Sequence, residues 1–154
     1  VTLDCFAVVP AAYLFLLRPG GAGDEVLLQR RGPTVPYMGG RWAAGAAGHV
    51  ERGETAVDAM VREAAEELGI APVSPIFLTT MQRTQGGEAI DERVDFFFTA
   101  RAWTGEPRIM EPDKASDLGW YPLGALPSPM VPHEETVLRA LASGTVPPYL
   151  SQGF

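Results

Sequence analysis

Residues 48–70 read GHVERGETAVDAMVREAAEELGI, and this stretch decides how the rest of the chain is interpreted. The range 54–68 contains neither glycine nor proline, which predicts a helix. Thr55 stands where an N-cap is expected, and Asp58, three residues later, is the acid that completes a capping box. Gly69 is the expected C-cap, because glycine adopts the left-handed conformation that ends a helix.

Helical periodicity assigns two faces to this segment. The expected buried stripe consists of four apolar residues that lie within about 60° of one another, at about 100° per residue on the helical wheel. They are Val57, Val61, Ala64 and Leu68. Three carboxylates spread over about 100° on the other side, namely those of Glu63, Glu66 and Glu67. The residues interleaved with them are small, Ala56 and Ala59, which leaves room for a ligand to approach the backbone.

Three carboxylates on one helical face repel one another. One interpretation is a solvated acidic surface, which is what most runs of helical glutamate are. The other is a site where Mg²⁺ offsets the repulsion, because Mg²⁺ prefers oxygen ligands and is usually shared between carboxylates and substrate phosphates. Gly48 offers a backbone carbonyl without steric hindrance, and Arg62 can hold a carboxylate through a charge-assisted hydrogen bond.

The same stretch resembles the Nudix box, GX5EX7REUXEEXGU, where U is a bulky apolar residue. Every fixed position is matched, by Gly48, Glu54, Arg62, Glu63, Glu66, Glu67 and Gly69. Ala64 is the one soft position, because it is small for U. On these residues the chain is similar to small bacterial MutT-like Nudix hydrolases.

This resemblance implies metal-assisted hydrolysis of a phosphoanhydride bond by water. The implied ligands of Mg²⁺, or of Mn²⁺ in its place, are Gly48 through its carbonyl and the carboxylates of Glu63, Glu66 and Glu67. Glu66 or Glu67 is expected to act as the general base, with Glu111 as the alternative. Arg62 orients the glutamates in this scheme. Glu54 lies about 180° from Glu63 on the helical wheel, so we expect it to serve the junction before the helix and Arg62.

The flanking sequence predicts strands on both sides of the box. Apolar runs suggest strands at 5–17, 25–31, 43–50, 76–83 and 94–102, with a second helix at about 132–142. Residues 71–75 read as a connector and 147–154 as a peripheral tail. This alternation favours an α/β (α+β) class in layers. The resemblance adds the Nudix fold, a mixed β-sheet sandwiched between α-helices, in a single domain over residues 1–154.

Four residues outside the box are candidates for substrate binding. Arg31 ends the second predicted strand and is placed to reach a phosphate, although it can equally be a surface arginine. Trp42 is either a core aromatic or a wall of the substrate pocket. Gln82 and Arg83 end a later strand, where we expect the base or sugar, the alternative being a polar pair at a loop edge.

The loop around EPDK supplies further candidates. Members of the resembled family commonly contribute an additional acid from this region, as a metal ligand or base. Glu111 is the first candidate for that role and Asp113 the second. Lys114 is placed either to pair with Glu111 or to face a phosphate of the substrate.

Composition limits the partners. The formal net charge of −7 over 154 residues argues against binding nucleic acid through a basic surface. The single Cys5 excludes an intrachain disulfide and suits a reducing cytoplasm. The apolar run at 5–17 is too short to span a bilayer, so no membrane association is expected. The sequence leaves monomer and homodimer open.

The expected partner is therefore a small-molecule nucleotide. By analogy with small family members, we expect a MutT-like nucleoside triphosphate pyrophosphatase that acts on 8-oxo-dGTP or a related nucleotide. CTP, dCTP, dihydroneopterin triphosphate and other diphosphates are alternatives within the enzyme class. A Nudix-fold ligand sensor without catalysis is the alternative from a different class, although such proteins usually carry a degraded box.

Overall fold

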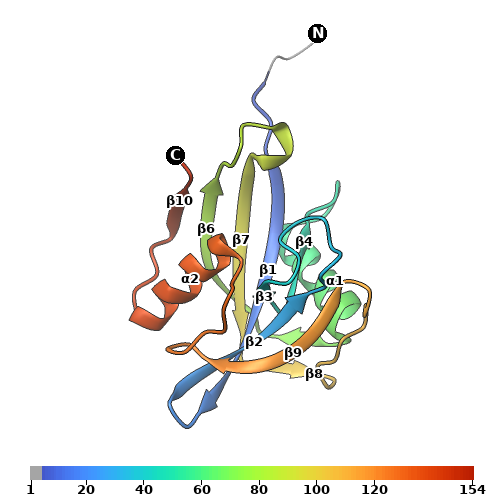
Figure 1. Ribbon diagram of the computed structural model, residues 1–154, viewed down its shortest axis with the longest axis vertical. Helices are drawn as coiled ribbons and strands as arrows, with labels where there is room; N and C mark the ends of the chain where they lie inside the picture. The colour runs from blue at the N-terminus through green and yellow to red at the C-terminus, as the bar shows by residue number, and fades with distance from the viewer. Residues whose placement is uncertain (1–4) are drawn as a thin grey trace.

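The computed structural model describes residues 5–154, in which a large β-sheet lies between two helices (Figure 1). The strands are β1 (Val9–Gly20), β2 (Gly23–Arg31), β3 (Trp42–Ala44), β4 (Ala46–His49), β5 (Ala71–Val73), β6 (Ile76–Arg83), β7 (Arg93–Ala100), β8 (Ala102–Thr104), β9 (Ala115–Pro122) and β10 (Tyr149–Gln152). The helices are α1 (Ala56–Leu68), the short 3-10 helix η1 (Ala89–Asp91) and α2 (Pro132–Ser143). The expected layered class with a mixed sheet is confirmed.

Strand order places β1 near the middle of the sheet. The eight-stranded sheet runs β10-β6-β7-β1-β2-β3, while β4 also pairs with β1 and β9 with β2. β1 is parallel to β7 and antiparallel to β2 and β4. β5 and β8 form a separate antiparallel pair.

Side chains of β1 alternate between two hydrophobic cores, one on each face of the sheet. One core, which includes Val137 and Leu138 of α2, receives Ala11, Tyr13, Phe15 and Leu17. The other, which includes Met60, Ala64 and Leu68 of α1, receives Ala12, Leu14 and Leu16. Burial on both faces explains why this strand is a continuous apolar run in the sequence.

The predicted caps of α1 are confirmed. The hydroxyl of Thr55 accepts a hydrogen bond from the backbone N–H of Asp58 at 3.0 Å, and the Asp58 carboxylate accepts one from the N–H of Thr55 at 3.0 Å. Gly69 has φ 68°, the left-handed conformation of a C-cap. These contacts fix the first and last turns of the helix.

The buried face of α1 differs from the predicted stripe. Val57 and Val61 are 46% and 41% exposed, whereas Ala59 and Met60 are 0% and 1% exposed. The prediction that Val57 and Val61 are buried was therefore wrong. The prediction that Ala59 lies on the acidic side, where a ligand can approach, was also wrong. Because α1 packs on β4, a strand of small residues, its own small side chains turn inward and allow close approach.

Three further segments differ from their predictions. The tail was wrongly taken as peripheral, because β10 extends the sheet in parallel with β6. The connector at 71–75 contains β5, whose partner β8 lies some thirty residues later in the chain. The first strand begins at Val9, and Cys5 lies before it and is exposed.

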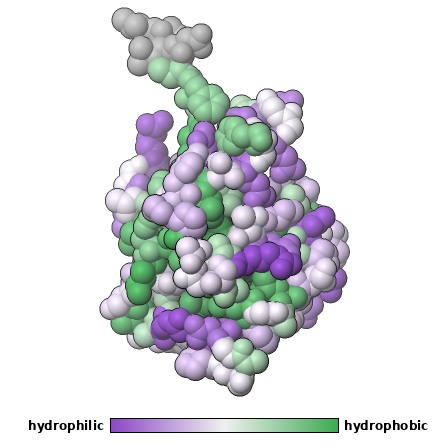
Figure 2. All heavy atoms as spheres, turned by 90° about the vertical axis from the view of Figure 1, so that its left-hand side faces the viewer, coloured by the Kyte–Doolittle hydropathy of each residue, from purple (hydrophilic) through white to green (hydrophobic). Residues whose placement is uncertain are grey.

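On the face that carries β10 and α2, hydrophilic and hydrophobic residues are interspersed (Figure 2). Across the described residues we find no helix with the length and apolar character needed to cross a membrane.

Neighbouring positions on α1 test its corrected orientation. Met60→Ala should lower the free energy of unfolding by about 2–5 kcal/mol, because it leaves a cavity in the core. Val61→Ala should change it by about 0.5 kcal/mol or less, because Val61 is exposed. Urea unfolding of both variants measures the difference, and equal losses would contradict the observed orientation.

Candidate active site

The guanidinium group of Arg62 organises the carboxylates around α1. Its Nε and one terminal nitrogen donate to the two carboxylate oxygens of Glu54, at 2.7 and 2.9 Å. The other terminal nitrogen donates to Glu63 at 2.7 Å and to Glu66 at 3.3 Å. The hydrogen bond from Arg62 lowers the pKa of Glu54 to about 2, so this carboxylate stays charged. The predicted orienting role of Arg62 therefore has a geometric basis.

Gly48 lies in β4 directly against the carboxylate of Glu63. A Cβ at this position would overlap the Glu63 carboxylate. The Glu63 carboxylate consequently occupies the space that any side chain at position 48 would need. The β4 strand thus brings the Gly48 carbonyl into the neighbourhood of the acids.

Glu67 is the most perturbed carboxyl of the box. Burial raises its pKa to about 8, and the nearby charges of Glu63 and Glu111 act in the same direction. One of its oxygens accepts hydrogen bonds from the backbone N–H of Ala47 at 2.9 Å and from the side-chain amide of Gln29 at 3.3 Å. A desolvated carboxyl held by two donors suits proton transfer near neutral pH.

The negative charges of the acids near Glu67 also affect the pKa of Glu63. Burial raises the pKa of Glu63 despite the opposing contact with Arg62, and the charges of Glu66 and Glu111 raise it further. Glu111 is itself paired with Lys114 at 2.9 Å. Among residues 5–154, no three acidic, histidine or cysteine side chains converge closely enough, as they stand, to form a ready-made metal site. The donor set of hard oxygens and its unbalanced negative charge nevertheless fit Mg²⁺.

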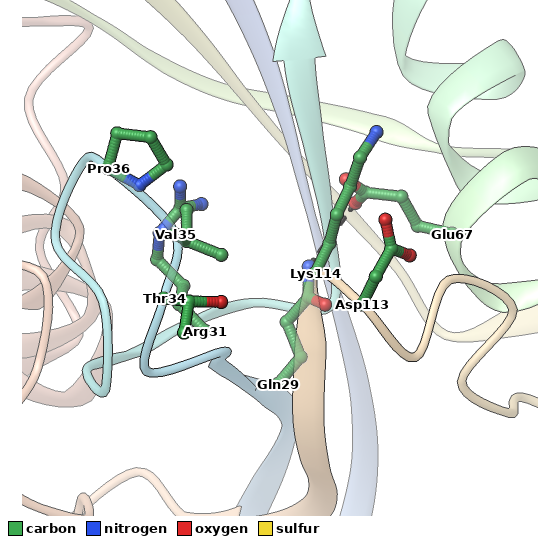
Figure 3. A pocket seen from close by; sticks show the side chains of 8 residues that line it. All are labelled: Gln29, Arg31, Thr34, Val35, Pro36, Glu67, Asp113 and Lys114. Carbon is green, nitrogen blue, oxygen red and sulfur yellow. Dashed lines mark hydrogen bonds between the residues drawn. The ribbon is translucent and has the colours of Figure 1, made fainter.

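Two adjoining cavities open beside Glu67. The first, about 420 Å³, is called here the loop cavity and is lined by Gln29, Arg31, Thr34, Val35, Pro36, Glu67, Asp113 and Lys114. Figure 3 shows residues 34–36 and Arg31 on one side of it and Lys114, Asp113 and Glu67 on the other. The second, about 350 Å³, is called the core cavity and includes Tyr13, Ala43, Arg83, Arg93, His133 and Glu134. Both cavities share Gln29, Arg31 and Glu67.

A buried polar cluster lines the core cavity. The hydroxyl of Tyr13 donates to Asp95 at 2.9 Å, and Arg83 forms an ion pair with Asp95 at 2.5 Å. The Nε2 of His133 lies 3.1 Å from the same hydroxyl. Because that hydroxyl donates to Asp95, Nε2 must be the protonated nitrogen of a neutral imidazole. Burial lowers the pKa of His133 to about 2, and Arg83 contributes in the same direction.

Glu134 is the second buried acid of the core cavity. One of its oxygens accepts a hydrogen bond from the backbone N–H of Ala44 at 2.7 Å. Its other oxygen lies 3.9 Å from His133, which is neutral, so the two do not form an ion pair. Burial raises the pKa of Glu134 to about 7. Near neutral pH this side chain can therefore exist in either protonation state.

The other candidates from the sequence divide into two groups. Arg31, Arg83, Asp113 and Lys114 line a cavity. Trp42 packs against the core, with its ring edge-on to Tyr121, and Gln82 accepts a hydrogen bond from Tyr149. Trp42 and Gln82 line neither cavity.

Sequence reasoning missed the residues that form the buried cluster, namely Tyr13, Asp95, His133 and Glu134. One signal was present, since Asp95 interrupts an otherwise apolar strand, and a buried acid requires a partner. The partner could not be identified in advance because Arg83 and Tyr13 lie on different strands.

The two buried groups of α2 should give opposite pH dependences of stability. The folded state favours the protonated form of Glu134. Its contribution to the free energy of unfolding is therefore complete below about pH 4.5 and is lost as pH rises through 7. His133 favours its neutral form, so its contribution is complete above about pH 6.5 and is lost as pH falls towards 2. Between these limits each slope reaches at most about 1.4 kcal/mol per pH unit.

Urea unfolding between pH 4.5 and 6.5 tests this balance. Relative to the parent chain, His133→Asn should shift the pH slope of stability towards a decrease with rising pH, and Glu134→Gln should shift it in the opposite direction. The neighbouring Glu135, which is only partly buried, provides the control, and Glu135→Gln should keep the profile of the parent chain. If all three variants share one slope, the assigned protonation states are wrong.

Comparison with known proteins identifies the family and the fold. The NUDIX domain model matches residues 8–141. A MutT NUDIX hydrolase from Burkholderia pseudomallei superimposes with a TM-score of 0.76 at 29% identity, covering 86% of this chain and 97% of that one. The NUDIX domain of Shewanella oneidensis NrtR, solved with ADP ribose, has a TM-score of 0.71 at 19% identity, covering 90% of this chain and 88% of that one. This second likeness concerns the fold alone.

Curated relatives extend the comparison. Isopentenyl-diphosphate Delta-isomerase of Jannaschia sp. (strain CCS1) is 31% identical over 118 residues, which cover 75% of this chain and 65% of that protein. The chain thus spans slightly less than two thirds of this relative. The 8-oxo-dGDP phosphatase NUDT18 of Mus musculus is 34% identical over 90 residues, which cover 57% of this chain and 26% of that protein. With the domain match, the box and the fold in agreement, the chain belongs to the Nudix family.

Proposed function

We propose that the chain is a Nudix hydrolase that cleaves a phosphoanhydride bond in a nucleoside di- or triphosphate derivative. The specific activity proposed is that of a MutT-like pyrophosphatase, which converts 8-oxo-dGTP or a related nucleoside triphosphate to the monophosphate and pyrophosphate. The observation that carries this proposal is the position of Glu67, a partly buried carboxyl of the box that lines two adjoining cavities.

Residues of the box have distinct tasks in this reaction. In its ionised form, Glu67 takes a proton from the attacking water, and its hydrogen bonds from Ala47 and Gln29 keep the carboxylate oriented. Arg62 holds Glu63 and Glu66 beside it and neutralises part of their mutual repulsion. Lys114, in the loop cavity, is placed to attract a phosphate once it leaves Glu111.

A divalent cation belongs to this scheme. Gly48 through its carbonyl and the carboxylates of Glu63, Glu66 and Glu67 would hold it, with Glu111 as a further donor. When bound, Mg²⁺ offsets the negative charge that accumulates on phosphate oxygens as the anhydride bond breaks. The cation would also account for the negative charge concentrated here, since Arg62 offsets only part of the repulsion between these acids.

A second candidate rests on the curated relatives. Five isopentenyl-diphosphate Delta-isomerases are 31–32% identical to this chain over 116–118 residues. A diphosphate with a carbon chain is therefore an alternative substrate, and isomerisation an alternative reaction. The alternative that is not an enzyme is a ligand sensor, which binds a nucleotide without turning it over.

A substrate panel separates these candidates. The chain should be incubated with Mg²⁺ and, in turn, 8-oxo-dGTP, CTP, dCTP, ADP-ribose and isopentenyl diphosphate, with phosphate and pyrophosphate release and double-bond position as readouts. We expect pyrophosphate from a nucleoside triphosphate, and no product when EDTA removes the metal. Isomer formation alone would favour the second candidate, and binding without any product would favour the sensor.

Replacement of the proposed base provides the most direct test of mechanism. Glu67→Gln should lower kcat by about 10²–10⁴-fold, because an amide cannot accept the proton. Its free energy of unfolding should not decrease, since the amide removes a carboxyl whose charged form is disfavoured by burial. Glu135→Gln, the same change at a partly exposed position outside both cavities, should retain full activity. Near-normal turnover by Glu67→Gln would refute the assignment.

Gly48 offers a steric test. In Gly48→Ala the new methyl group must displace the Glu63 carboxylate, so we expect loss of Mn²⁺ affinity, measured by electron paramagnetic resonance, and loss of turnover. Stability should change little, because the displaced atoms end a flexible side chain. Gly21→Ala is the control, because a Cβ at that position meets nothing within 4 Å. Unchanged Mn²⁺ affinity in Gly48→Ala would remove the Glu63 carboxylate from the metal site.

A further inference from the structure

The sheet face opposite α2 is left open at the strands β6, β7 and β10. In Figure 1, α2 crosses in front of β6 and β7, and the core beneath it includes Leu78, Met81, Phe97 and Leu150 of these strands. Because side chains alternate along a strand, the residues between them point to the other face. α1 lies on that face, but among residues 5–154 the core beneath α1 receives no side chain of β6 or β10.

The open residues of these strands form a surface that we call the outer sheet face. Strand register sets Thr80 beside both Phe96 and Tyr149, and it sets Phe77 opposite Phe98, a residue of the core beneath α1. Phe77 and Tyr149 are 49% and 55% exposed. The outer sheet face consists of residues that are exposed or half-buried, namely Phe77, Thr80 and Gln82 of β6, Val94 and Phe96 of β7, and Tyr149 and Ser151 of β10.

The outer sheet face is uncharged in a chain that is otherwise acidic. None of its side chains carries a charge at neutral pH, although the formal net charge of the chain is −7. Arg83 and Asp95, which are charged residues of the same strands, pair with each other on the α2 side. Depletion of charge together with exposed aromatic side chains is typical of the core of a protein–protein interface.

The polar groups of the outer sheet face suit contact with a second copy of themselves. The hydroxyls of Thr80 and Ser151 and the amide of Gln82 can each donate and accept hydrogen bonds. The hydroxyl of Tyr149 donates to Oε1 of Gln82 at 2.9 Å, which leaves the amide nitrogen of Gln82 as a donor and the Tyr149 oxygen as an acceptor. A two-fold axis brings the same surface of two chains together, so groups that both donate and accept can pair across it, whereas like charges would repel.

The exposed valines of α1 border the outer sheet face. Glu63, whose carboxylate lies against Gly48 of β4, marks one flank of the helix. Val57 and Val61 lie about 120–160° from Glu63 on the helical wheel. Because β4 lies on one side of β1 and β7 on the other, this second flank is turned towards β7. The valines, 46% and 41% exposed, therefore add apolar surface beside the strands.

We propose that the outer sheet face is the interface of a homodimer related by a two-fold axis, in which the sheets of two chains pack face to face. Approach through other surfaces is disfavoured, because two chains of net negative charge repel each other. No residue of the outer sheet face lines the loop cavity or the core cavity, so a second chain at this face fills neither of them. The dimer is therefore independent of the proposed reaction.

Sedimentation velocity over a range of concentrations tests this interface. The chain should be dimeric at about 100 µM and dissociate below about 1 µM, as expected of an interface of modest size. Phe77→Asp should weaken dimerisation at least about thirtyfold, because it removes an aromatic contact and buries a carboxylate without a cation. Phe6→Asp is the matched control, because Phe6 is 72% exposed and precedes β1, and it should keep the parental dissociation constant.

A second variant keeps the test decisive if Phe77→Asp fails to fold. Ser151→Arg places a large charged side chain at an exposed position of β10, which the monomer tolerates, and it should weaken dimerisation to a similar extent. Circular dichroism identifies which variants are folded, and only folded variants are compared.

The outcomes separate the homodimer from other arrangements. A parental dimer that is weakened in the folded variants of positions 77 and 151, but not in Phe6→Asp, supports the interface whether or not any nucleotide is hydrolysed. A parental chain that stays monomeric at about 100 µM overturns it and leaves the outer sheet face to a different partner. Parental dimerisation in Ser151→Arg, or an equal loss in Phe6→Asp, also overturns it, since the contact would then lie elsewhere.

Discussion

The concentration of negative charge between α1 and β4 is the constraint on which the site depends. Acids so close together are unfavourable unless positive charge accompanies them, and Arg62 supplies that charge from within the helix. By contacting Glu54 before the helix and the carbonyl of His49 in β4, it also joins three segments of chain. One guanidinium group thereby fixes the positions of several carboxylates, including that of Glu66, which stays exposed to solvent.

Burial then gives the acids different properties. Glu54 is held charged by Arg62, whereas Glu67 is withdrawn from solvent and resists ionisation. Two glutamates of one short sequence thus have pKa values shifted in opposite directions, because their surroundings differ. Such a separation allows one carboxyl to act as a fixed structural anion while another exchanges a proton.

The sheet brings the remaining cavity residues to the same place. β1 is parallel to β7 and antiparallel to β2 and β4, so the start of β7 lies near the ends of β2 and β4. Arg93, Arg31 and His49 occupy those positions, and α2 adds His133 from the other layer. The core cavity is consequently built from segments that lie far apart in the sequence, and its lining includes Glu67 of the box.

The sequence alone determined the local features. The caps of α1, the spacing of the acids, their association with Arg62 and the strand β6 depend on neighbouring residues, so they could be predicted directly. The layered class followed from the alternation of apolar runs.

Only the tertiary structure decided which side of α1 is buried, since that depends on the small residues of β4 against which the helix packs. It alone paired β10 with β6 and Asp95 with Arg83, because hydrogen bonds across a sheet leave no periodic trace in the sequence. The pKa values of Glu67, His133 and Glu134 are likewise tertiary properties, since desolvation depends on everything packed around a group rather than on its neighbours in the chain.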